Sequence, residues 1–259
     1  LGSPSLTTNH MTPGQAGGAL RRSLLTARRP GRAVVRAGCK AGHWAARGCE
    51  VARAQMDDAA SLAEAFKGAT GVFTLPPPGF DPSPGFPEAR AVIAAVAQAI
   101  DAAAPQKVLC LSTIRAQAEQ PNLLPQRTLM EQALSALDIP VTFLRPAWFM
   151  ENSLYDGISA RDTGVIHSFL QPLDKAVPMI ATADVGRLAA QLLQQHWTGR
   201  RVVELEGQWV SPNDIARTLT EVLDRGVTAR VVPRDTWEPM FREQGAQNPL
   251  PRIERTGVG

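Results

Sequence analysis

The chain has 259 residues, a net charge of +3 and 44% hydrophobic residues, which suits one large α/β domain with or without a small appendage. This charge is too low, and the basic residues are too dispersed, for a nucleic-acid-binding surface. Three cysteines without a CxxC pair argue against a disulfide framework, and no run of about 18 apolar residues is present to cross a membrane. We therefore expect a cytoplasmic protein with no signal peptide, no membrane anchor and no nucleic-acid partner.

The first segment, from Leu1 to Pro13, is polar and predicts a coil. Dinucleotide-binding folds begin with an apolar strand that leads to a glycine-rich turn, so a missing or degraded first strand is expected here. The next segment, GQAGG from Gly14 to Gly18, precedes ALRRSLLTA, a predicted helix. Two glycines before a helix are by themselves a weak sign of a phosphate-binding turn.

A regular alternation of strands and helices follows. We predict strands at residues 31–38, 49–58 and 71–78, and helices at residues 40–47, 59–67 and 88–104. Asp57 and Asp58 precede an alanine-rich run and are interpreted as helix caps rather than catalytic carboxylates. Pro76 ends the third of these strands, because proline has no N–H to donate to a sheet.

The most informative stretch extends from Lys107 to Asn152. KVLCLSTI predicts a buried strand, QRTLMEQALSAL predicts a helix with one apolar face, and VTFLRP predicts a second buried strand. This order forms a parallel βαβ unit, and ligands of such sheets bind beyond the carboxyl ends of the strands. We expect Ser112, Thr113 and the segment from Pro146 to Phe149 to line that crevice.

The last third of the chain begins with a segment whose hydrophobic pattern is less regular. Residues 151–175 show no clear period, whereas residues 178–195 predict a helix with an N-cap signal at Thr182. A strand is predicted at residues 201–207. Ser211 then caps a predicted helix that has Pro212 at its first position.

The residues of the central stretch (LSTI, the helix that carries Glu131, and FLRPAWFMEN) resemble the NmrA-like branch of the atypical short-chain dehydrogenase/reductases. The resemblance runs from Gly14 to Phe241. It implies a Rossmann-type, doubly wound and mostly parallel sheet in residues 1–150. It also implies a small C-terminal substrate lobe in residues 151–259, with residues 182–205 returning to the main domain. Some members reduce quinones or azo dyes, and others are redox-sensing regulators without a known reaction.

The resemblance also implies a cofactor site. In the TGxTGxxG turn of the family, Gly14 and Gly17 match the last two glycines, and Met11 stands at the first. Arg36 ends the second strand, where an arginine accommodates the 2′-phosphate of NADP; this favours NADP(H) over NAD(H), and the alternative is a plain surface arginine. Gln55 stands where relatives carry an aspartate. The predicted cofactor-binding residues are Gly14, Gln15, Ala16, Gly17, Arg36, Gln55, Met56, Leu75, Pro76, Pro77, Ser112, Thr113, Pro146, Trp148 and Phe149.

The acceptor is expected at the same edge of the sheet. Phe80 and Phe86, in the proline-rich loop from residue 79 to 87, would cover a flat ring; the alternative is a stiff surface loop. Trp148 or Phe149 would stack on the acceptor, and Asn152 would bind a carbonyl. The alternative for both aromatics is core packing between the lobe and the sheet.

No catalytic residue is assigned from the sequence. The Tyr-x-x-x-Lys pair of the wider superfamily is absent, since residue 159, four positions after Tyr155, is serine. Gln126 and Arg127 stand where some relatives place a histidine or lysine, and His167 is either a proton donor or a structural histidine. Two functions stay open: an NADP(H)-dependent reductase of a quinone-like or other conjugated acceptor, as monomer or homodimer, and a non-catalytic NADP(H) sensor that binds a protein partner. No metal-binding motif is present.

Overall fold

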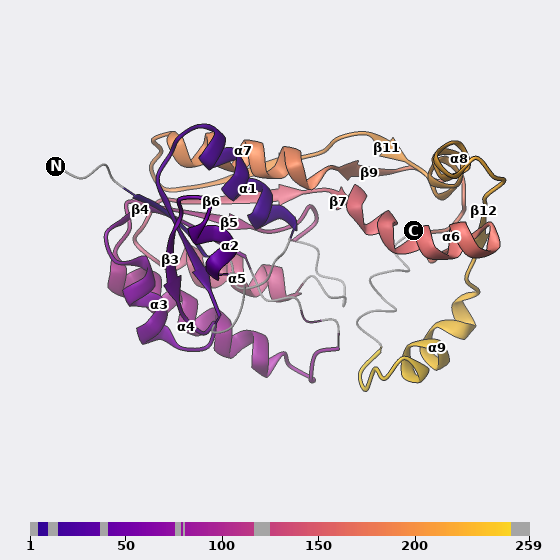
Figure 1. Ribbon diagram of the computed structural model, residues 1–259. Coiled ribbons are helices and arrows are strands. Elements are labelled where there is room, and N and C mark those ends of the chain that lie inside the picture. Colours follow the sequence, from indigo (N-terminus) through magenta and orange to yellow (C-terminus); the bar gives the residue numbers. More distant parts are fainter. Residues whose placement is uncertain are drawn as a thin grey trace.

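The computed structural model describes residues 5–9, 15–36, 41–75, 79, 81–116 and 125–249. At its centre lies a seven-stranded sheet in the order β10-β6-β5-β4-β1-β2-β3, and all neighbouring strands are parallel (Figure 1). The strands are β1 (Ser5–Asn9), β2 (Gly31–Val35), β3 (Glu50–Arg53), β4 (Ala69–Thr74), β5 (Lys107–Leu111), β6 (Val141–Pro146) and β10 (Arg200–Leu205). The predicted α/β class with a doubly wound parallel sheet is confirmed.

Helices cover both faces of this sheet, with α3, α4 and α5 on one face and α1 and α7 on the other (Figure 1). Adjacent residues of one strand serve different cores: Val72 packs with the first group of helices and Phe73 with the second. This is the alternation of a strand that is buried on both faces. The helices are α1 (Gln15–Thr26), α2 (Ala41–Ala45), α3 (Ala59–Phe66), α4 (Pro87–Ala103), α5 (Pro125–Ser135) and α7 (Thr182–Gln194).

The prediction of a coil in place of the first strand is wrong for Ser5–Asn9. These residues form β1, between β2 and β4, with Leu6 opposite both Gly31 and Gly71. A strand between two others has its backbone N–H and C=O groups paired on both sides, and this pairing does not depend on apolar side chains. The dinucleotide-binding fold is therefore complete at its first strand.

The remaining elements form a smaller group beyond one end of the sheet (Figure 1). The parallel pair β8 and β12 packs with α6 and α8 around Ala160, Ile166, Ala216 and Val227, and β7, β9 and β11 form a three-stranded sheet. The elements are β7 (Trp148–Phe149), η1 (Met150–Asp156), α6 (Gly157–Thr163), β8 (Val165–Ser168), β9 (Val177–Ile180), β11 (Trp209–Val210), α8 (Pro212–Leu223), β12 (Thr228–Val231), η2 (Arg234–Thr236) and α9 (Trp237–Glu243).

The predicted helix caps Asp58 and Ser211 are confirmed, whereas Asp57 and Thr182 are not the capping residues of α3 and α7. The carboxylate of Asp58 accepts the first backbone N–H groups of α3, and Ser211 forms a capping box with Asp214 at the start of α8. Thr182 does not cap α7. Instead, the carboxylate of Glu151 in η1 accepts both the backbone N–H of Thr182, at 2.8 Å, and its hydroxyl, at 2.5 Å. A residue 31 positions away thus caps the helix.

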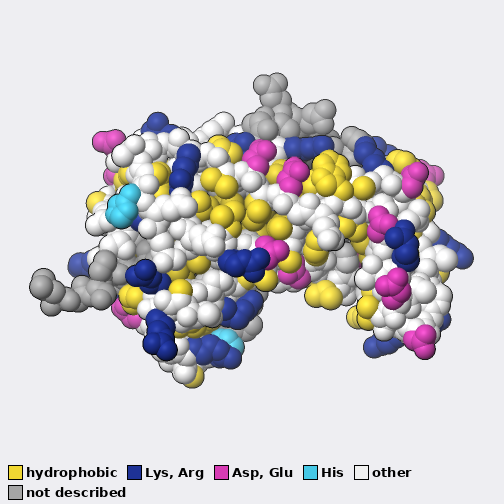
Figure 2. Space-filling model, turned by 90° about the horizontal axis from the view of Figure 1, so that it is seen from above, with side chains coloured by type: hydrophobic (Ala, Val, Ile, Leu, Met, Phe, Trp, Pro, Cys, Tyr) yellow, Lys and Arg dark blue, Asp and Glu magenta, His cyan; other side chains and the backbone are white. Residues whose placement is uncertain are grey.

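The surface agrees with the low net charge. Figure 2 shows hydrophobic side chains in the middle of the upper face and Lys and Arg side chains at several separate places around them. In the part of the chain that the structure describes, no helix is both long and apolar enough to cross a bilayer.

Candidate functional site

All seven strands of the main sheet run in the same direction, so their carboxyl ends lie at one edge. The predicted site residues follow the ends of these strands or begin α1, which follows β1. Arg36 follows β2, Gln55 lies two residues beyond β3, Leu75 follows β4, and Ser112 follows β5. The topology therefore brings residues from five separate segments to the edge where parallel sheets bind nucleotides.

Helix α1 points its amino end at this edge. Ala16 and Gly17 are buried in its first turn, whereas Gln15 is exposed. The second helix of this face packs very closely, because a Cβ at Gly186 of α7 would lie 2.4 Å from the backbone nitrogen of Leu20. The backbone N–H groups at a helix start favour a phosphate. Gly14 and Met11 lie outside the described residues.

Two hydroxyls at the ends of β4 and β5, Oγ1 of Thr74 and Oγ of Ser112, are buried and have no hydrogen-bond partner among the described residues. The strands are neighbours, with Thr74 opposite Cys110, so both groups lie at the same part of the edge. Burying a hydroxyl without a partner costs free energy, and native proteins rarely leave it so. The pair therefore fits a polar ligand at this edge. Thr74 was not singled out from the sequence, although a threonine that ends a buried strand is a usable signal.

The other predicted cofactor residues differ in exposure. Arg36 and Gln55 are exposed, and Pro146 is buried. Met56 is half-buried against the core beneath α3 and α4, and Leu75 against the core beneath α1 and α7. Pro76 and Pro77 lie outside the described residues.

The start of α5 is tied to the loop that follows β4. The amide of Gln126 is buried and its Nε2 donates to the carbonyl of Gly79 at 3.0 Å. Gly79 has to be small, because a Cβ there would lie 2.9 Å from Oε1 of Gln126. The hydroxyl of Thr128 donates to the carbonyl of Ala116, so α5 also fixes the segment after β5. Gln126 is therefore a structural residue, not an acid, as its residue type already indicated.

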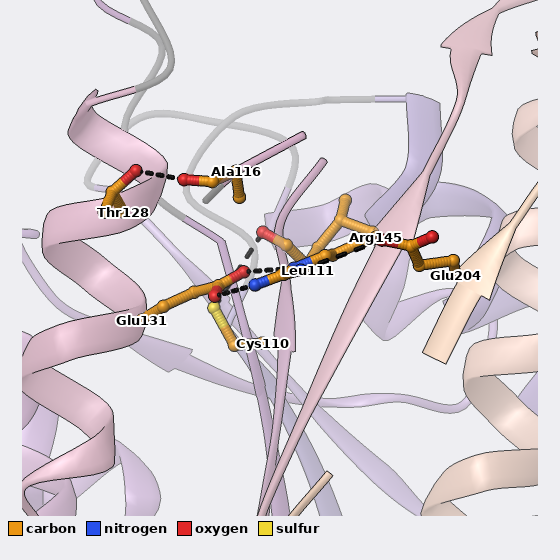
Figure 3. Close-up of polar contacts among 7 residues, drawn as sticks. All are labelled: Cys110, Leu111, Ala116, Thr128, Glu131, Arg145 and Glu204. Carbon is orange, nitrogen blue, oxygen red and sulfur yellow. Dashed lines mark hydrogen bonds and ion pairs between the residues drawn. The ribbon is translucent and has the colours of Figure 1, made fainter. Parts of the chain in front are cut away.

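A buried ion pair joins α5 to the sheet next to this edge (Figure 3). Arg145 of β6 donates from Nε to Oε1 of Glu131 at 3.0 Å and from Nη2 to Oε2 at 2.7 Å, and each side chain is 12% exposed. Glu204 of β10, half exposed, lies 3.7 Å from Nη1 of the same arginine. Burial raises the pKa of the neighbouring Cys110 thiol, which keeps it protonated and unreactive in the core.

The aromatic residues expected at the acceptor site are half-buried. Trp148 and Phe149 form β7, which pairs with β9, and Phe149 also packs against the core beneath α1 and α7. Phe86 is half-buried directly before α4, with a positive φ of 58°. Asn152 is exposed, and Phe80 lies outside the described residues. Partial burial leaves a stacking role and an anchoring role open for Trp148 and Phe149.

Few of the described side chains near the candidate site are positioned to donate a proton to a bound acceptor. Tyr155 is 81% exposed. Asp156 in η1 has a pKa raised by burial, and this rise is opposed by the nearby His167 of β8. Within the described ranges no three His, Cys, Asp or Glu side chains gather into a metal-binding group. This region therefore offers positioning groups and hydroxyl donors rather than an evident proton donor.

Comparison with known proteins matches a family model, the NmrA-like family, over residues 12–251. Solved structures of similar fold include the Citrobacter sp. triphenylmethane reductase complexed with NADP(H), with a TM-score of 0.80 and 23% identity over 96% of this chain and 87% of that chain. The NADPH-dependent quinone oxidoreductase of Escherichia coli complexed with NADPH also gives 0.80 and 23%, over 97% and 87%. A nucleoside-diphosphate-sugar epimerase of Staphylococcus aureus gives 0.80 and 19%, over 98% and 89%.

No curated protein matches the chain in sequence. The solved structures are similar in fold, and at identities of 19–23% this likeness concerns the fold alone. The family model, by contrast, spans most of the chain, from α1 through β6, with the ion-paired helix α5, to the elements after β6. The chain therefore belongs to the NmrA-like family.

Proposed function

We propose that the protein is an NADP(H)-dependent reductase of a quinone-like or other conjugated small-molecule acceptor. The observation that carries the proposal is the pair of buried hydroxyls, Thr74 and Ser112, at the carboxyl edge of the sheet, which have no partner among the residues described. A cofactor with ribose and amide groups would supply the missing hydrogen bonds. Two of the similar structures are described as NADP(H)- or NADPH-bound reductases, which supports the same reading.

The residues at the carboxyl edge of the sheet could bind successive parts of an NADP(H) molecule. The amino end of α1, at Ala16 and Gly17, would hold the pyrophosphate with backbone N–H groups. Arg36 after β2 would pair with the 2′-phosphate of NADP(H). Proteins that prefer NAD carry an acidic residue at this place, which would repel that phosphate. Thr74 and Ser112 would donate to the half of the cofactor that lies over β4 and β5.

When bound, NADPH supplies the hydride, and the protein binds and orients the cofactor. The hydrogen bond from Gln126 to Gly79 and the ion pair between Glu131 and Arg145 hold the loops around the site in place. Trp148 and Phe149 would face a flat acceptor. The proton that completes reduction of a quinone-like acceptor comes from water, because Gln126 is engaged by Gly79 and is not an acid.

We further propose that residues 151–259, apart from 182–205, form the acceptor lobe of a cytoplasmic monomer or homodimer. Glu151 supports this division, because its carboxylate binds the first residue of α7 and so joins the first turn of the lobe to the main domain.

One observation favours the second candidate, a non-catalytic NADP(H) sensor. The chain lacks a Tyr-x-x-x-Lys pair. Gln126, which stands at the start of α5 where some relatives place a proton donor, is instead hydrogen-bonded to the carbonyl of Gly79. NADPH oxidation across a panel of small quinones, with NADPH binding measured in parallel, separates the two. Turnover with at least one quinone supports the reductase. Tight NADPH binding without turnover supports the sensor, and absence of NADPH binding contradicts both.

A further inference from the structure

The amino edge of the main sheet carries a group of hydrogen-bond donors that the proposed reaction does not use. Lys107 begins β5 and Arg201 is the second residue of β10, so both lie one strand length away from the candidate cofactor edge. Both cations lie over the indole ring of Trp197, in the loop between α7 and β10. Lys107 Nζ is 5.2 Å and Arg201 Cζ 4.5 Å from the ring centroid, which is a double cation–π contact.

Among the residues that the structure describes, the positive charges of this group have no anionic partner. Lys107 is only 8% exposed, and its Nζ donates to the backbone carbonyl of Gln195 at 2.6 Å. Arg201 donates from Nε to Oγ1 of Thr142 at 2.8 Å and from Nη2 to Oε1 of Gln195 at 3.0 Å. Over the described ranges of the chain, neither cation has a carboxylate within 4.0 Å. Burial, and then the charge of Arg201, lower the pKa of Lys107.

The indole itself adds a donor that is left over. Nε1 of Trp197 is buried and has no hydrogen-bond partner in the described part of the chain. Helix capping explains in part why Lys107 lies here. Gln195 is the C-cap of α7, and a cation is favourable at the negative end of a helix. Capping explains neither the second cation, Arg201, nor the unpartnered indole N–H. A donor-rich, acceptor-poor group of this kind is satisfied by an anion with several lone pairs.

We propose that Lys107, Arg201 and the indole N–H of Trp197 bind a phosphate-class oxyanion at the amino edge of the sheet. Arg201 has N–H groups left after its two hydrogen bonds, and its planar fork suits two oxygens of such an ion. The ammonium of Lys107 likewise keeps N–H groups after its bond to Gln195. The anion would also neutralise the repulsion between the two cations. This site is independent of the proposed reductase activity, because it lies at the opposite edge of the sheet.

The test is thermal unfolding as inorganic phosphate replaces chloride at constant ionic strength. Because a ligand that binds only the folded state raises its melting temperature, phosphate should stabilise the unmodified protein more than chloride does. Trp197→Phe keeps an aromatic ring beneath the cations and removes the N–H together with the five-membered part of the indole, so phosphate affinity should fall about tenfold. Lys107→Met should abolish the specific stabilisation.

Two control variants locate the effect. Arg200→Met removes a neighbouring exposed charge on the same strand and should keep the full phosphate response. Arg36→Met at the cofactor edge should also keep it, which separates this site from a cofactor phosphate site. Equal stabilisation by phosphate and chloride, an unchanged response in Trp197→Phe, or loss of the response in Arg36→Met would each overturn the proposal. If Lys107→Met does not fold, Trp197→Phe decides alone.

Discussion

Replacement of Glu131 by glutamine should destabilise the protein strongly although it changes few atoms. Arg145 now donates two hydrogen bonds, at 3.0 and 2.7 Å, to a carboxylate that is as buried as the guanidinium itself. Glutamine can accept one of them and turns its own N–H donors toward the other. The buried positive charge then keeps Glu204, at 3.7 Å and half exposed, as a carboxylate neighbour.

Breaking a buried pair by removing one partner costs about 3–5 kcal/mol. Since Glu204 remains close enough to compensate in part, we expect a loss at the lower end, about 3 kcal/mol in the free energy of unfolding. Glu204→Gln is the matched control, because the same chemical change at an exposed partner should cost less than about 1 kcal/mol. The double variant Glu131→Leu with Arg145→Met removes both charges and should recover most of the loss.

Urea denaturation of the four proteins, followed by circular dichroism and extrapolated to water, gives the three differences. Equal losses for Glu131→Gln and Glu204→Gln would refute the reasoning, because the buried geometry would then contribute nothing beyond a surface pair. A double variant less stable than Glu131→Gln would refute it as well, since the cost would then come from lost packing rather than from an uncompensated charge.

Three further predictions concern single residues. Arg36→Glu should weaken NADPH binding about tenfold or more and leave NADH binding nearly unchanged, because it reverses the charge facing the 2′-phosphate; equal changes for both cofactors in calorimetric titrations would count against the assignment. Trp148→Ala should reduce quinone turnover per folded molecule if the ring stacks on the acceptor, whereas a loss of roughly 3–5 kcal/mol of stability with normal turnover would make it a core residue. The pKa of Asp214 is lowered to about 2, first by its hydrogen bond with Ser211, so its contribution is present above its ordinary value of 3.8 and is lost as the pH falls through about 2. Asp214→Asn should therefore melt earlier than the unmodified protein at pH 7, and most of this difference should be gone at pH 2; a difference at pH 2 as large as that at pH 7 would contradict the cause.

The sequence predicts well those features that depend on neighbours along the chain. Asp58 and Ser211 were recognised as helix caps because a cap and the N–H groups it accepts lie within a few residues. The central βαβ unit was likewise recognised from apolar runs and one amphipathic helix. β1 was missed because the apolar pattern is the signal for a strand, whereas Ser5–Asn9 gains its stability from backbone pairing with β2 and β4.

The contacts that shape the site join residues far apart in the chain. The hydrogen bond from Gln126 to Gly79 spans 47 positions in the sequence, and the helix cap that Glu151 provides to Thr182 spans 31. No local periodicity encodes such contacts, since they depend on how α5, η1 and α7 pack. The position of Thr74 beside Ser112 likewise follows from the order of the strands, not from their sequences.

The central claim is that the unpartnered hydroxyls of Thr74 and Ser112 form part of an NADP(H) site. Calorimetric titration of NADPH into the unmodified protein and into the double variant Thr74→Val with Ser112→Ala tests it most directly. Without cofactor, the double variant should be at least as stable as the unmodified protein, because two buried unpaired hydroxyls are removed, yet it should bind NADPH about tenfold or more weakly. Unchanged NADPH affinity in a folded double variant would contradict the claim.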